Sequence, residues 1–184
     1  MIFMMSAILP VLAQSKYEKE VRIRERYVPQ IARDFVDQLN LGSRIKWYQE
    51  FGKDTYSYEA KTRYDGSRMS IEFSGTGVFE DVEIEIKTTD VPQEAHIKMI
   101  DFLNDSYPKY QIDKIQVQYS GSEEAVLAQF TNKTHTHGLV IRYEVVLSAK
   151  KDGQYSLFEY LFSENGSFVS RNKIVLKTTD NLEY

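Results

Sequence analysis

Four short motifs occur twice in this chain of 184 residues, in the same order each time. The matched pairs are Val28–Gln30 with Val91–Gln93, Tyr58–Ala60 with Tyr143–Val145, Phe73–Phe79 with Phe162–Phe168, and Lys87–Asp90 with Lys177–Asp180. Ordered self-similarity of this kind is typical of a duplicated structural unit. We therefore expect a first α-β4 unit at residues 28–90 and a second at residues 91–180, with an insertion near residues 120–138.

Each copy is predicted to begin with a helix. Pro29 and Pro92 suit a first helical turn, where the N–H that proline lacks has no partner to lose. Apolar residues near Pro29 recur at intervals of three and four and predict one buried stripe; they are Val28, Ile31, Ala32, Phe35, Val36 and Leu39. Pro108 ends the second helix, because the residue before a proline avoids helical backbone.

The rest of each copy alternates between apolar and polar residues, the pattern of a strand with one buried face. Strands are expected at 45–51, 56–64, 69–73 and 82–86, and again at 112–119, 139–149, 155–162 and 168–176. The predicted fold class is α+β: a tandem repeat of a helix followed by a four-stranded antiparallel sheet, with the helices packed on one sheet face. We expect the two copies to share a continuous sheet and the opposite face to be polar and solvated. The residues that fit this solvated face are Glu59, Lys61, Arg63, Glu72, Glu83 and Glu85.

Residues 1–13 carry no charge and are mostly apolar, whereas residues 14–27 form a charged segment. An apolar run of this length, with small residues near Val11–Ala13, is typical of a signal peptide and its cleavage site. The run is too short to span a bilayer as a helix, which needs about 20 residues, and no later segment is apolar enough. We therefore expect an exported protein, periplasmic or secreted, without a stable membrane span. The alternative is a buried N-terminal helix or strand.

At this point the residues resemble a family. A helix opened by Val-Pro, a strand with a tryptophan, a Tyr-x-Ala strand and an apolar strand ending in a glycine turn are similar to the PepSY-like exported bacterial proteins. The matching residues are Val28–Pro29, Phe35, Trp47, Tyr58–Ala60, Phe73, Gly77 and Asp90–Pro92. The resemblance covers roughly residues 28–178. It implies a fold like that of the β-lactamase inhibitory proteins, and its motifs are structural rather than catalytic.

Composition and motifs argue against several function classes. The chain has no cysteine, which excludes disulfides, thiolate metal sites and cysteine nucleophiles. A net charge of −4 spread along the chain argues against nucleic-acid binding. Phosphate-binding glycine loops, serine-hydrolase elbows and HExxH zinc motifs are missing from the sequence. We therefore expect no enzyme activity, no cofactor, and no catalytic or metal-binding residue.

Six residues are candidates for contact with a partner. Tyr48 shares a predicted strand face with Lys46 and Glu50, and aromatic residues are favoured at interfaces. The others are Glu59, Lys61, Arg63, His135 and His137. The two histidines would share a strand face and could hold a metal, but a polar loop is the plainer interpretation.

Two carboxylate patterns are open to a second interpretation. Asp81, Glu83 and Glu85 form a row at strand spacing that could bind calcium or a basic partner, although a solvated strand face alternating with Val82, Ile84 and Ile86 is the plainer interpretation. Glu59 and Glu144 recur at matching positions of the two copies. They could form an acid/base pair, but the repeat itself accounts for their recurrence.

The leading hypothesis is an exported, non-enzymatic module that binds a protein or peptide of the cell envelope. One alternative is an inhibitor of an envelope protease or β-lactamase, in which the segment 120–138 enters a cleft. Another is a carrier of a small ligand or metal that uses His135 and His137.

Overall fold

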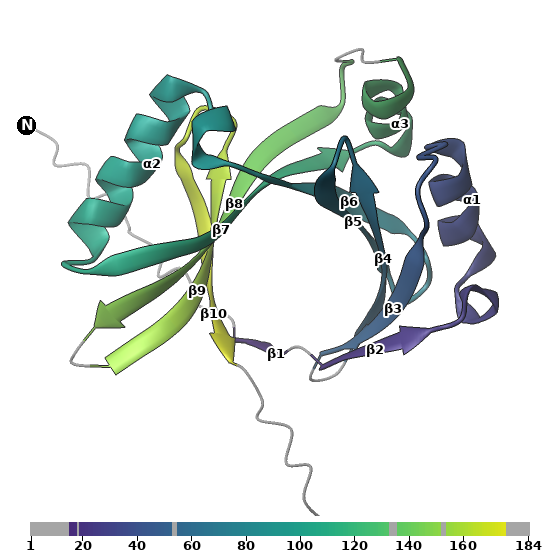
Figure 1. Cartoon of the computed structure of the whole chain (residues 1–184), viewed down its shortest axis with the longest axis horizontal. Coiled ribbons are helices and arrows are strands. Elements are labelled where there is room, and N and C mark those ends of the chain that lie inside the picture. Colours follow the sequence, from purple (N-terminus) through teal and green to yellow (C-terminus); the bar gives the residue numbers. More distant parts are fainter. Residues whose placement is uncertain (1–14, 18, 53–54, 133–135, 152–153, 176–184) are drawn as a thin grey trace, which may run out of the picture.

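The computed structural model describes residues 15–17, 19–52, 55–132, 136–151 and 154–175 (Figure 1). Most of them lie in ten strands that form one sheet. The strands are β1 (Ser15–Tyr17), β2 (Lys19–Ile23), β3 (Lys46–Phe51), β4 (Tyr56–Tyr64), β5 (Ser67–Ser74), β6 (Phe79–Ile86), β7 (Tyr110–Gly121), β8 (Leu139–Lys151), β9 (Gln154–Ser163) and β10 (Phe168–Val175). The α-helices of the described residues are α1 (Gln30–Gln38), α2 (Gln93–Ser106) and α3 (Glu123–Asn132).

The sheet curves into a ring, and the N-terminal segment that contains β1 and β2 connects its two ends. Strands β2 to β10 follow one another as antiparallel neighbours, and β1 pairs in parallel with β10 at the far end. Because only residue 18 separates β1 from β2, the segment 15–23 joins the two ends of the sheet. Figure 1 shows the resulting ring of strands, with α1, α2 and α3 on its outside.

The predicted fold class, a tandem repeat of a helix and a four-stranded sheet, is wrong. The described residues form a single sheet, and two strands, β1 and β2, precede the first helix. A third helix, α3, lies between β7 and β8, in the segment expected to be an insertion. Of the repeated motifs, Val28–Gln30 and Val91–Gln93 lie at helix starts, Phe73–Phe79 and Phe162–Phe168 span turns, and Tyr58–Ala60 and Tyr143–Val145 lie inside strands, whereas Lys177–Asp180 lies outside the described residues. Such local signals do not report which distant strands pair. The sheet is continuous across the middle of the chain, where β6 pairs with β7.

The hydrophobic core lies between the outer face of the sheet and the helices. Under α1, the ring of Phe35 stacks on Phe79 at 4.3 Å and meets Phe73 edge-on at 5.9 Å. Under α2, Phe102 stacks on Phe168 at 4.7 Å. Such aromatic pairs add to the free energy gained by burying their area.

A buried pair of tyrosine hydroxyl groups and a glycine in a turn complete the packing around α2. The hydroxyl groups of Tyr107 and Tyr160 share a buried hydrogen bond of 2.7 Å, so both polar ends are satisfied. The β9–β10 turn approaches the first turn of α2 at Gly166, which has a φ of +81° and lies against the Ala95 backbone. Only glycine adopts this conformation without strain and leaves room for that contact.

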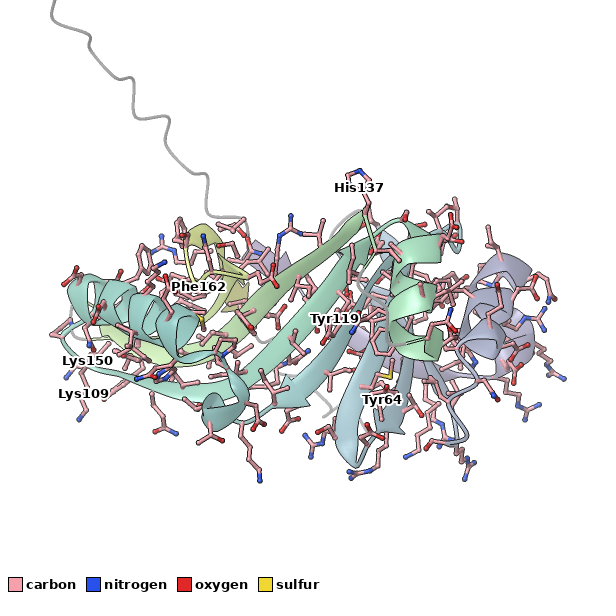
Figure 2. All side chains as sticks on the ribbon, turned by 90° about the horizontal axis from the view of Figure 1, so that it is seen from above. Tyr64, Lys109, Tyr119, His137, Lys150 and Phe162 are labelled. Atoms are coloured by element: carbon pink, nitrogen blue, oxygen red, sulfur yellow. The ribbon has the colours of Figure 1, made fainter. Side chains whose placement is uncertain are left out.

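Helix α3 packs over β7, and its Phe130 meets Tyr64 of β4 and Tyr119 of β7 edge-on at 5.4 and 5.3 Å. Figure 2 shows both tyrosines close to α3. Of the described helices, none has the length and apolar character needed to cross a membrane. The apolar segment 1–13 lies outside the described residues.

Candidate functional site

The candidate site is the inner face of the sheet, defined as the face turned away from the three helices (Figure 1). Side chains alternate between the two faces of a strand, and the register places the polar positions of neighbouring strands opposite one another. Tyr48 lies opposite Glu59, Lys61 opposite Ser70, and Ser70 opposite Glu83. The inner face is therefore polar across six consecutive strands, from β3 to β8.

A group of ion pairs on β2 and β4 forms one part of this face. The Nζ atom of Lys61 lies 3.0 Å from a carboxylate oxygen of Glu59 and 2.6 Å from one of Glu20. The same Nζ lies 5.0 Å from the centre of the Tyr48 ring, within the range of a cation–π interaction. These four side chains come from three strands that are adjacent in the sheet.

Burial changes the proton affinity of Glu59. Glu59 is only 5% exposed. This burial raises the pKa of the Glu59 carboxyl to about 7, although the positive charge of Lys61 acts to lower that pKa. Burial lowers the pKa of Lys61, but the carboxylates of Glu20 and Glu59 outweigh it and raise that pKa overall. Glu59 therefore sits near its protonation midpoint at neutral pH.

Carboxylates also gather on β5 and β6, where side-chain amides from β7 donate to them. Gln116 Nε2 donates to Glu83, and Gln118 Nε2 lies 3.2 Å from Asp81 and 3.3 Å from Glu83. One oxygen each of Glu72, Asp81 and Glu83 lie within 4.8 Å of one another. Carboxylate groups this close are common without an ion. Of the row expected from the sequence, Asp81 and Glu83 come together, whereas Glu85 lies 3.6 Å from Arg68.

A hollow of about 360 Å³ opens between the ion pairs of Lys61 and the carboxylates of β5 and β6. Its charged and amide residues are Glu59, Lys61, Arg68, Glu83, Glu85, Lys114 and Gln116. Two long ion pairs lie at its margin, Arg68 with Glu85 at 3.6 Å and Lys114 with Glu144 at 3.8 Å. Because partly exposed ion pairs contribute little to stability, these side chains can exchange partners at small cost. The hollow offers both donors and acceptors to a polar ligand.

The structure brings three of the predicted contact residues together and separates the others. Tyr48, Glu59 and Lys61 meet on the inner face. Arg63 lies on the same face of β4 but is exposed, and donates to the Gly66 carbonyl at 2.7 Å. His137 lies exposed in the turn before β8, near one end of α3 (Figure 2). His135 lies outside the described residues, so the two-histidine metal site stays a prediction.

The burial of the predicted solvated face differs from expectation, because Glu59 and Glu83 are 5% and 6% exposed. The inward bend of the sheet brings neighbouring side chains over them. Lys114 and Gln116 were missed as members of this face. A bulge between Ile112 and Lys114 shifts the pairing of β7 with β8, and alternation alone carries no signal for such a bulge.

No protein-family model matches the chain, and no curated protein matches it in sequence. The PepSY-like resemblance therefore stays a prediction. Solved structures do match. A DUF2874 family protein from Bacteroides ovatus is 10% identical with a TM-score of 0.52, over 79% of this chain and 87% of that chain.

Two further structures are similar to this chain. A Bacteroides eggerthii protein provisionally assigned to the periplasm is 11% identical with a TM-score of 0.51, over 80% of this chain and 89% of that chain. A BLIP-like protein from Bacteroides fragilis is 17% identical with a TM-score of 0.49, over 85% and 92%. At such identities the likeness of the two structures with the higher TM-scores shows a shared fold alone.

Proposed function

We propose that this chain is an exported, non-enzymatic binding protein that holds a protein or peptide segment against the inner face of its sheet. The observation that carries the proposal is the hollow on that face, where cations and carboxylates from several strands stand side by side. A polar surface of mixed charge selects partners by electrostatic complementarity more than by apolar burial.

The physical state of the ion pairs supports a binding role. Lys61 is held by two carboxylates, whereas Arg68 and Lys114 make contacts of 3.6 and 3.8 Å that are longer than a close hydrogen bond. A partner that supplies better-placed carboxylates to Arg68 and Lys114 would replace weak contacts with stronger ones. The rigid sheet beneath keeps these groups in position, which lowers the entropy cost of binding.

Export is supported by two independent observations. Residues 1–13 are uncharged and apolar in the way of a signal peptide. A protein with the same fold is provisionally assigned to the periplasm. The partner in this proposal is therefore a component of the cell envelope.

Site-specific photocrosslinking in intact cells tests the proposal. A photoreactive amino acid at Ser70, in the hollow, is expected to form a covalent adduct with one discrete envelope protein. The matched control is the same amino acid at Lys98 on the outer side of α2, which should give none. Equal adducts from both positions, or adducts from Lys98 alone, would show that the inner face is not the binding surface.

A further inference from the structure

A second hollow, of about 530 Å³, lies at the β2 end of the sheet. Its lining residues are Arg22, Ile23, Arg24, Glu25, Ile45, Lys46 and Trp47. Three of them are cations, and we name Arg22, Arg24 and Lys46 the cationic corner. The corner carries a positive excess in a protein whose net charge is −4.

Glu25 is the one carboxylate among the lining residues of this hollow, so the cations outnumber the anions there. Within the stretches that the structure describes, none of the three side chains takes part in an ion pair or a hydrogen bond. All three residues are exposed. Lys61 differs, because its ammonium group contacts both Glu20 and Glu59. Lys46 lies opposite Lys61 in the β3–β4 register, so the two lysines are neighbours with different surroundings.

The register also places Lys46 opposite another cation, Lys61. Arg24 follows β2 directly, keeps an extended backbone and lines the same hollow as Lys46. Directly opposed like charges destabilise a pair of strands. An anionic group bound in the hollow would reduce the repulsion among these cations, and guanidinium groups bind carboxylates through paired hydrogen bonds.

The corner is continuous with the inner face. Arg22 lies opposite Tyr48, and Tyr48 lies opposite Glu59. An occupant of the inner face therefore reaches the corner without leaving the same surface. This continuity favours a peptide segment over a lipid surface as the source of the anionic group.

We infer that the segment bound on the inner face carries a short run of acidic residues at one end and docks that run on the cationic corner. This inference rests on the proposed function and specifies its partner. The acidic run must be short, because the segment next meets the carboxylates of β5 and β6. With neighbouring strands about 4.8 Å apart, Glu83 on β6 lies roughly 14 Å from Lys46 on β3, about four residues of extended chain.

Fluorescence anisotropy with the full chain tests the inference. The probe is a labelled peptide of about ten residues with three acidic residues at one end, a length that spans the inner face. The reference peptide carries Gln and Asn in place of those acids. We expect the acidic probe to bind more tightly, and the double variant Arg24→Gln, Lys46→Gln to weaken it about tenfold while leaving the reference unchanged.

The matched controls separate this inference from the proposed function. Lys98→Gln, on α2, removes a cation from the outer surface and should change neither affinity. Ser70→Trp fills the inner hollow and should weaken both peptides. A double variant that binds the acidic probe as tightly as the wild type overturns the inference, even if Ser70→Trp abolishes binding and so supports the inner face. Loss in the double variant without any effect of Ser70→Trp supports the acidic contact and counts against the inner face.

A sedimentation assay with phosphatidylglycerol vesicles tests whether the anionic group that binds the cationic corner belongs to a lipid instead of a peptide. Binding to vesicles that the double variant abolishes, together with no preference for the acidic peptide, would overturn the inference. Sedimentation of wild type and double variant in equal amounts supports the peptide assignment.

Discussion

Glu59 shows how burial on the inner face converts a surface carboxylate into a titrating group near neutral pH. Its neighbours have opposite effects, because Lys61 stabilises the charged form and Glu50 destabilises it. The sequence correctly placed Tyr48, Glu59 and Lys61 on one face through simple alternation. It could not give their burial, since that depends on the curvature of a sheet built from distant strands.

The raised pKa of Glu59 predicts a pH-dependent stability. Between about pH 4.5 and about pH 7, the folded protein retains a proton on Glu59 that the unfolded chain releases. The contribution of Glu59 to the free energy of unfolding of the wild type should therefore fall as the pH rises through this window. The Glu59→Gln variant should lack this component, so its stability relative to the wild type should rise from about pH 5 to about pH 8 in urea titrations.

Glu94→Gln is the control for that measurement. A hydrogen bond from Lys98 lowers the pKa of the exposed Glu94 carboxyl, so its titration lies below the window. A relative stability of Glu59→Gln that stays constant across the window would contradict the assignment of a buried, proton-retaining carboxyl.

At the scale of elements, local signals predicted most of the structure and long-range pairing was missed. The predicted strand at 56–64 coincides with β4 (Tyr56–Tyr64), because its alternation is strict and Asp65-Gly66 ends it. Helix α3 was missed, although Ser122 Oγ accepts a hydrogen bond from the Ala125 N–H and so caps it. Strands β1 and β2 lie in a short charged segment. Strand β1 pairs with β10 from the other end of the chain, and β2 pairs with β3 across the intervening helix α1.

The turn between β9 and β10 gives an element-scale prediction. Gly166→Ala forces an alanine into a φ of +81° and pushes its Cβ against the Ala95 backbone in the first turn of α2. We expect a loss of more than about 1 kcal/mol in the free energy of unfolding, measured by urea denaturation. Gly66→Ala is the control, because that glycine also has a positive φ but nothing lies within 4 Å of an added Cβ. Equal losses in the two variants would show that the contact with α2 contributes nothing.

At the scale of the molecule, closure of the sheet distinguishes the two faces. The outer face is covered by helices, whereas the inner face keeps its charges in a hollow that no described helix covers. The sequence implied a helix-covered sheet with a polar opposite face, and this much is correct. It did not imply a ring, because closure depends on β1 pairing with β10, a strand from the other end of the chain, and no local pattern in the sequence indicates that pairing.

The central claim is that the inner face is the surface that holds a partner segment. Amide chemical-shift mapping tests it most directly, using the isotope-labelled full chain and the strongest binder selected from a displayed peptide library. The account predicts shifts concentrated at Tyr48, Lys61, Ser70 and Gln116, with the exposed surfaces of α1 and α2 unchanged. Shifts concentrated on α1 or α2, with these four residues unaffected, would contradict it.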